Sequence, residues 1–210
     1  MLRSISAAVI AAIFLSACTY EVKTTAAPAL NVYSSYGEKL AGKYALLVHS
    51  DIMTKEVEPS SDNCGPHDYP IDARAAFKQS AIQTVTQLVE TVEPVETALT
   101  ATDLAAGGYK GQIIVKAEEY DPRLTFIPGF WVAHASSTVD ISASLLVDGP
   151  EGRLLGTKAS ESRTVESDAS GCGSGTDALA KANSKAMAAV LDRLAERFSN
   201  EPRLRTAALP

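Results

Sequence analysis

Residues 136–147 read SSTVDISASLLV, and this stretch decides the fold. Its apolar side chains recur at every second position from Val139, and Asp140, Ser142 and Ser144 lie between them. Such alternation is typical of a β-strand that buries one face and exposes the other to water. We therefore predict that residues 136–147 form a half-solvated strand of an antiparallel sheet.

Further strands are expected on both sides of this one. Residues 148–152 read DGPEG, which favours a tight turn, and residues 153–166 return as the hairpin partner. The stretches YKGQIIVKAEEY at 109–120 and KYALLVHS at 43–50 have the apolar content of two more strands. Residues 92–97 are open to interpretation as a fifth, short strand. Such a strand would change the direction in which the chain crosses the sheet.

Two amphipathic helices are predicted. Pro70 stands at a first helical position, and apolar side chains recur after it at spacings of three and four up to Val92. The second helix begins at Ser174 or Thr176, either of which suits an N-cap, and continues to about Phe198. Both helices therefore have one apolar face to bury.

The order of these elements defines the fold class. Over residues 43–199 it is β-α-β-β-β-α, which predicts an α+β domain with a four-stranded, mostly antiparallel sheet and two helices packed on one face. This is a two-layer sandwich. Residues 200–210 are expected to be a disordered tail.

The N-terminus has the pattern of a bacterial secretion signal. Arg3 supplies a positive charge, and residues 6–15 supply an apolar run of about 10 residues, half of the length that spans a bilayer. Residues 15–18, LSAC, resemble the lipobox of bacterial lipoproteins. The resemblance implies that residues 1–17 are removed and that Cys18 carries acyl chains, palmitate among them, as a membrane anchor.

The residues after Cys18 bear on where the protein resides. Thr19 stands where an aspartate would resemble the inner-membrane retention signal, so the outer membrane is favoured. Residues 18–42 lack a clear period up to Gly42 and are expected to form the lipidated end and a flexible tether.

The charge of the chain argues against one class of partner. Removing residues 1–17 takes away one charged side chain, Arg3, so the net charge changes from −6 to −7. Nucleic-acid binding needs a basic face that neutralises phosphates. No nucleic-acid partner is therefore expected, and no cofactor is predicted.

Two cysteines remain once Cys18 carries lipid. Cys64 and Cys172 are an even pair in an oxidising compartment, which favours a disulfide between them. In the predicted meander, both cysteine loops follow strands that run in the same direction and so lie at one end of the domain. The same reasoning places the loop between strands two and three at that end and the tether at the opposite end.

Matches to catalytic and metal-binding motifs are incomplete. Gly173-Ser174-Gly175 lacks the strand-to-helix spacing of a hydrolase nucleophile. His49 and His134 are interpreted as structural. Cys64 and His67, with Asp68, have the spacing of half a metal site, but the disulfide competes for the thiol. We predict no catalytic residue and no metal ligand.

Residues 121–132, DPRLTFIPGFWV, are expected to be a loop with an aromatic cluster. Its apolar side chains either fold back as a lid on the core or are presented to a partner. The candidate partner-binding residues are Phe126, Ile127, Phe130 and Trp131.

A wider resemblance accompanies these motifs. The lipobox-like LSAC, the turn VDGPEGRLLGT at 147–157 and the alanine-rich last helix resemble small envelope lipoproteins of the ABC-transport-auxiliary and lipopolysaccharide-assembly type. The resemblance covers most of residues 43–199. It implies a non-enzymatic outer-membrane lipoprotein that faces the periplasm and assists an assembly or transport machine by docking on an envelope protein. Two alternatives are a binder of lipid or lipopolysaccharide in a groove between helices and sheet, and an envelope hydrolase.

Overall fold

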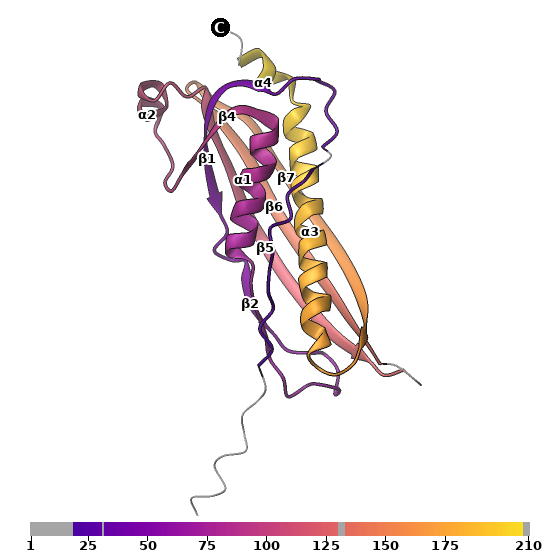
Figure 1. The fold of residues 1–210 in the computed structure, drawn as a ribbon. Coiled ribbons are helices and arrows are strands. Elements are labelled where there is room, and N and C mark those ends of the chain that lie inside the picture. Colours follow the sequence, from indigo (N-terminus) through magenta and orange to yellow (C-terminus); the bar gives the residue numbers. More distant parts are fainter. Residues whose placement is uncertain (1–18, 31, 130–132, 208–210) are drawn as a thin grey trace, which may run out of the picture.

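The computed structural model describes residues 19–30, 32–129 and 133–207, which form a mixed sheet with helices on one face (Figure 1). The sheet has five strands in the order β4-β1-β5-β6-β7. β1 lies parallel to both β4 and β5, whereas β6 is antiparallel to β5 and to β7. The strands are β4 (Val89–Val95), β1 (Leu40–His49), β5 (Gly111–Ile127), β6 (Ala133–Gly149) and β7 (Gly152–Ala169).

Two long helices cover this sheet, and smaller elements lie at its two ends (Figure 1). Helix α1 (Arg74–Leu88) packs on β4 and β1, and α3 (Ser174–Ser199) packs on β6 and β7. We call one end the disulfide end: it holds the loop between β2 (Thr54–Val57) and β3 (Tyr69–Asp72), the last residues of β5 and β7, and the start of α3. The far end holds α2 (Ala101–Ala106), α4 (Pro202–Ala207) and the turn between β6 and β7.

The sheet differs from the predicted four-stranded, mostly antiparallel one because residues 89–95 form β4. β4 is parallel to β1, with Leu40 opposite Val89 and Leu47 opposite Val95. It lies at the edge of the sheet, where Pro94 is tolerated because one side of an edge strand needs no hydrogen-bonded neighbour. The first two strands of the five-stranded sheet, β1 and β4, are therefore parallel and are connected through helix α1. The predicted α+β class is correct.

The predicted loop at 121–132 is also mostly strand. β5 continues to Ile127, which pairs with His134 of β6, while Pro122 pairs with Val139. Pro122 is accommodated because the pairing of β1 with β5 ends at Lys116, so the proline has no β1 neighbour to bond. The alternation of buried and exposed residues, with Leu124 and Phe126 buried, shows the period of a strand.

The core lies between the helices and one face of the sheet. On this face, Ile113, Val115, Ile141 and Leu145 are buried. Their neighbours Lys116 and Ser144 are exposed or partly exposed on the other face, whereas Gln112 and Ser142 are buried as well. The helices supply buried side chains at helical spacing, as expected for amphipathic helices. In α1 they are Ala76, Phe77, Ser80, Ala81, Thr84 and Val85, and in α3 they include Leu179, Ala182, Ala186, Val190, Leu194 and Phe198.

The bounds of α1 and the structure of the last residues also differ from the prediction, which ran the helix to Val92 although it ends at Leu88. α1 begins at Arg74, because Pro70 pairs with Glu56 in the small β2–β3 sheet. The predicted disordered tail contains α4, in which Leu204 is buried in the core cluster and Arg205 donates a hydrogen bond to the carbonyl of Lys39. Within the described residues, no helix has the length and apolar character needed to cross a membrane.

Candidate functional site

Residues 19–30, which we call the N-terminal strap, lie along the helical face of the domain. From Leu40 at the far end the preceding chain runs back between α1 and α3 to the disulfide end (Figure 1). The side chains of Val22 and Ala29 are only 4% and 3% exposed. The prediction of a flexible tether over residues 18–42 is therefore wrong for the strap, because Val22 and Ala29 belong to the buried core cluster.

Hydrogen bonds hold the strap along its whole length. Near its start, the backbone N–H groups of Tyr20 and Val22 donate to the carbonyls of Asp68 and Pro70, at 2.9 and 3.0 Å. These contacts make isolated bridges, parallel to β3. Thr24 Oγ1 donates to the carbonyl of Asp72 at 2.7 Å. The first half of the strap thus follows β3.

The second half of the strap is held by two hydroxyl groups of α1. Ser80 Oγ accepts from the N–H of Ala27 at 2.8 Å, and Thr84 Oγ1 accepts from the N–H of Ala29 at 3.0 Å. Both hydroxyls are buried on the helix face that carries Phe77 and Ala81. Ser80 and Thr84 are polar residues four positions apart on an otherwise apolar helix face. Because buried hydroxyls need hydrogen-bond partners, such a pair in a sequence indicates that another segment packs on the helix.

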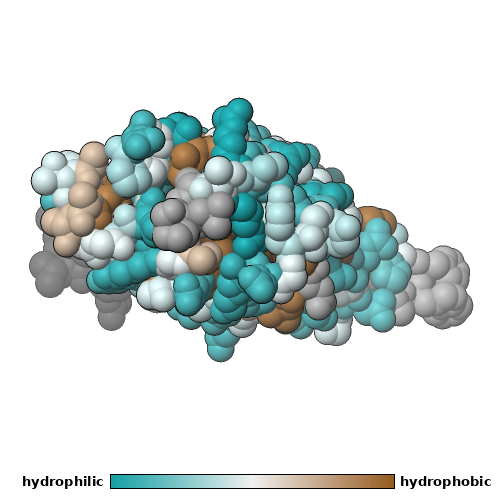
Figure 2. All heavy atoms as spheres, turned by 90° about the horizontal axis from the view of Figure 1, so that it is seen from above, coloured by the Kyte–Doolittle hydropathy of each residue, from teal (hydrophilic) through white to brown (hydrophobic). Residues whose placement is uncertain are grey.

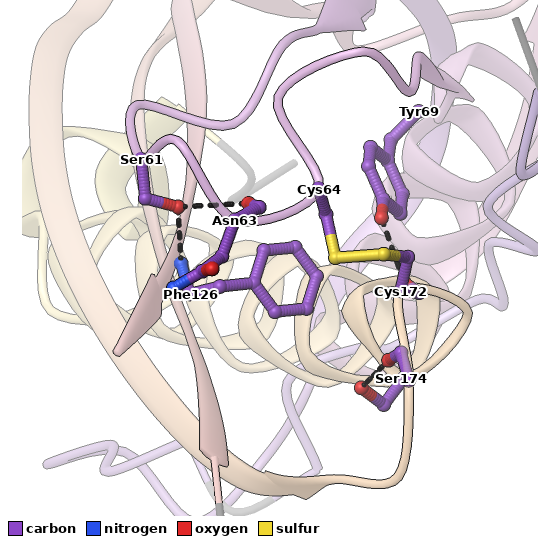
Figure 3. The surroundings of a disulfide bond; sticks show 8 residues. Ser61, Asn63, Cys64, Tyr69, Phe126, Cys172 and Ser174 are labelled. Carbon is purple, nitrogen blue, oxygen red and sulfur yellow. Dashed lines mark hydrogen bonds between the residues drawn. A yellow bond between two sulfur atoms is a disulfide. The ribbon is translucent and has the colours of Figure 1, made fainter. Parts of the chain in front are cut away.

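The disulfide end is closed by a bond between Cys64 and Cys172, whose Cα atoms are 5.6 Å apart (Figure 3). The bond joins the loop after β2 to the loop before α3, as the direction of the strands predicted. Ser61 ties the first loop to β5, because its Oγ accepts a hydrogen bond from the N–H of Phe126 at 3.0 Å. Tyr69 ties the second, because its hydroxyl donates to the carbonyl of Cys172 at 2.7 Å.

Three aromatic rings from distant segments meet beside this bond. Tyr20 stacks on Tyr69, and Tyr69 lies against Phe126 with ring centroids 6.2 Å apart. We call these three residues the aromatic cluster. Burial raises the pKa of the Tyr69 hydroxyl to about 12, because the charged form would lose its hydration. Gly175, at the start of α3, lies so close to Tyr69 and Phe126 that it leaves no room for a Cβ.

The structure separates the four predicted partner-binding residues. Phe126 is 3% exposed and belongs to the aromatic cluster, so it is a core residue, not a residue presented to a partner. Ile127 is 45% exposed at the end of β5. Phe130 and Trp131 lie outside the described residues, as does the predicted lipidation residue Cys18.

The strap also changes which end of the domain the lipid would occupy. The prediction placed the tether opposite the loop between β5 and β6. β1 does begin at the far end, but the strap returns to the disulfide end, where Thr19 forms a bridge with Asp68. The described chain therefore begins at the same end as Ile127.

Among the described residues, the most exposed large hydrophobic ones lie at the far end. Leu30 and Tyr33 are 68% and 69% exposed, and Asn200 holds this segment by donating from Nδ2 to the carbonyl of Tyr33 at 3.1 Å. Next to them is a groove of about 540 Å³ lined by Tyr36, Lys39, Leu40 and Arg205 among others. The guanidinium of Arg205 lies 4.7 Å from the centre of the Tyr36 ring. Figure 2, a view onto this end, shows a mostly hydrophilic surface with small separate hydrophobic groups.

The three histidines lie on β6, in the loop before β3 and at the end of β1. His134 Nδ1 lies 3.3 Å from Asp168 Oδ1 across the β6–β7 pair, and both side chains are well exposed. His67 packs edge-on against Tyr20 with centroids 5.3 Å apart, and His49 ends β1. Over the described part of the chain, no group of three His, Cys, Asp or Glu residues is placed to hold a metal ion.

Comparisons with known proteins give distant similarity only. No protein-family model and no curated sequence matches the chain. A solved protein from Xanthomonas campestris is 12% identical, with a TM-score of 0.42 over 90% of this chain and 96% of that one. A putative neuraminyllactose-binding hemagglutinin homolog from Helicobacter pylori is 10% identical, with a TM-score of 0.45 over 85% and 98%.

A minor lipoprotein from Acinetobacter baumannii is 8% identical, with a TM-score of 0.39 over 77% of this chain and 93% of that one. At these identities and TM-scores, no function is carried over. The function has to be argued from the residues of this chain.

Proposed function

We propose that this chain is a non-enzymatic, lipid-anchored accessory protein of the bacterial outer membrane, which faces the periplasm and docks on another envelope protein. The observation that carries the proposal is the position of the lipobox-like LSAC at residues 15–18. It ends directly before Thr19, which forms a bridge with Asp68 of the folded domain. Cleavage before Cys18 would leave all the described residues in the mature chain.

The Cys64–Cys172 disulfide supports an export destination. Disulfides persist in the periplasm and are rare in the reducing cytosol. The bond closes a loop of 108 residues, so it is a structural feature of the whole domain and not of one turn. Both observations favour the same compartment.

The far end is the surface that we assign to a protein partner. Leu30, Tyr33 and Tyr36 are exposed there, and tyrosine is enriched among the residues that dominate binding energy at protein interfaces. The groove is lined by two basic residues, Lys39 and Arg205, and one acidic residue, Glu38, so its net positive charge favours a partner with acidic side chains at the rim of the contact. The partner would then meet an end that the anchor leaves free.

The alternative, a binder of lipid or lipopolysaccharide between helices and sheet, gains no support from the packing. The cavity bounded by α1, α3 and the sheet, lined by Val85, Leu145 and Leu191 among others, measures only about 10 Å³. That is the space of roughly one water molecule. An acyl chain would require the helices to move apart.

Two measurements test the proposal. Labelling with radioactive palmitate should mark the wild-type protein and not Cys18→Ser, whose precursor should stay uncleaved. Chemical cross-linking in intact cells should then capture one envelope protein with the wild-type chain, and a Leu30→Ser, Tyr33→Ser double variant should lose it. Ile127→Ser, at the other end, is the matched control and should retain it. A wild-type protein that takes up no palmitate would count against the anchor. A double variant that still captures the partner would count against the docking surface.

A further inference from the structure

The N-terminal strap fixes the distance between the fold and any lipid on Cys18. Thr19 is the one residue between Cys18 and Tyr20, whose N–H is bonded to Asp68 and whose ring is stacked on Tyr69. Two residues of extended chain span at most about 7 Å. The acylated residue therefore cannot lie far from the disulfide end.

The strap also keeps the domain from moving away from the anchor. It is held at Tyr20 and Val22 by β3 and at Ala27 and Ala29 by α1, so its contacts are spread along the length of the domain. A single hydrogen bond could break and let the strap leave the domain, whereas contacts at four separated positions hold it in place. Releasing the strap would expose Val22, which is buried.

From these constraints we propose that the disulfide end rests on the lipid surface and that the sheet stands upright on the membrane. This inference rests on the proposed lipidation of Cys18. Among the described residues, Ile127 is an exposed apolar side chain at the end of β5 and would meet the headgroup layer. Because β6 runs 17 residues from this end to the other, the far end lies roughly 55 Å from the membrane at about 3.3 Å per residue.

The charges at the disulfide end determine which lipid headgroups this end can approach. Asp62, Asp168 and Glu58 are exposed at the disulfide end, so the surface is acidic and repels anionic headgroups. The open face of the sheet carries charged pairs, such as Lys116 with Glu118, which lose hydration if that face lies on a bilayer. The covalent anchor, not attraction of charges, holds the end at zwitterionic lipid.

Site-specific photo-crosslinking tests the orientation on the mature lipoprotein. p-Benzoylphenylalanine replaces Ile127 at the disulfide end or Glu151 in the β6–β7 turn, and the protein is reconstituted into vesicles of phosphatidylethanolamine and phosphatidylcholine, which are both zwitterionic. Mass spectrometry first establishes the acyl chains on Cys18. We expect lipid adducts at position 127 and none at position 151.

A strap variant separates anchoring from orientation. Val22→Asp places a charge in a buried position and should release the strap, so that adducts appear at position 151 as well. Lys23→Asp, at the exposed neighbouring position, should keep the wild-type pattern. Neutron reflectometry of a supported bilayer gives a second measure: the upright domain makes a layer of roughly 55 Å, against about 20 Å for one sheet and one helix layer lying flat.

The outcomes distinguish the two proposals. An acylated protein with equal adducts at both positions, or a flat protein layer, overturns the upright orientation and leaves the lipoprotein assignment intact. A protein without acyl chains rejects both.

Discussion

Tyr20 stacks on Tyr69 with ring centroids 5.4 Å apart and ring planes inclined by 21°. This contact joins the first described residues of the chain to β3. Because the Tyr69 hydroxyl also bonds the carbonyl of Cys172, three segments from different parts of the sequence meet at one place. The stability of the disulfide end should therefore depend on a few residues, each of which can be tested.

Removing the disulfide should destabilise the whole domain. In the chain-entropy model, a bond that closes a loop of 108 residues contributes about 4–5 kcal/mol, which is an upper figure. We expect Cys64→Ser with Cys172→Ser to lower the midpoint of urea unfolding, followed by circular dichroism. Reductant should produce the same shift in the wild-type protein and none in the double variant. An unchanged midpoint would show that the bond constrains only its local loops.

Replacing Gly175 by alanine should cost stability although alanine favours helices. A Cβ at this position would lie 2.8 Å from Leu124 Cδ2, 2.9 Å from Tyr69 Cε1 and 3.0 Å from Phe126 Cζ. Overpacking of this kind costs about 1–3 kcal/mol, which outweighs a helix-propensity gain of about 1 kcal/mol.

Gly173→Ala is the matched control, because its Cβ would meet the Tyr20 ring at an ordinary 3.4 Å. Thermal melting of the two variants should separate them clearly. Equal melting temperatures would mean that the aromatic cluster rearranges freely.

Acid should destabilise the protein partly through Asp72. Its carboxylate accepts hydrogen bonds from the side chain and the backbone N–H of Arg74, which lowers its pKa from 3.8 to about 2. A lowered folded-state pKa gives stability that is present above the unfolded pKa and is lost as the pH falls from about 4 towards about 2. Asp72→Asn should flatten this part of the curve of unfolding free energy against pH.

Arg74→Gln should flatten the same part of the curve, because it removes the other partner of the bond. If both variants keep the wild-type slope, another carboxylate is responsible for the acid dependence.

Alkaline pH should destabilise the protein through Tyr69. Burial raises its folded-state pKa to about 12, so its contribution is complete below the unfolded pKa of about 10 and is lost between about pH 10 and about pH 12. Tyr69→Phe should remove this loss, while the missing hydrogen bond to Cys172 costs about 0.5–1.5 kcal/mol at neutral pH. Tyrosinate absorbance measured together with unfolding checks the alkaline loss and the loss at neutral pH. The control Tyr33→Phe, at an exposed position, should leave both the alkaline loss and the stability at neutral pH unchanged.

Much of the fold could be predicted because the pattern of burial follows local periods. The alternation in residues 136–147 and the apolar stripe of α3 locate two central elements within a few residues. β4 was harder, since VETVEPV is short, half exposed and contains a proline that argues against a strand in most positions. Its edge location, which permits Pro94, depends on the neighbouring strands and is not visible locally.

The N-terminal strap could not be predicted from its own sequence. Thr19 to Leu30 has no apolar period, because only Val22 and Ala29 are buried and the other contacts are made by the backbone. The information lies instead in α1, where Ser80 and Thr84 interrupt an apolar face. The cysteine pairing was predictable because it depends on strand direction, which the fifth strand left unchanged at both loops.

The separation of Cys64 and Cys172 also sets an order of events during export. If the chain is exported as we propose, from its N-terminus, Cys64 arrives 108 residues before Cys172. The bond could then not close until β7 had crossed the membrane. Until that point Cys64 would be an unpaired thiol, open to other cysteines and to oxidases, so correct oxidation would depend on the arrival of the segment before α3.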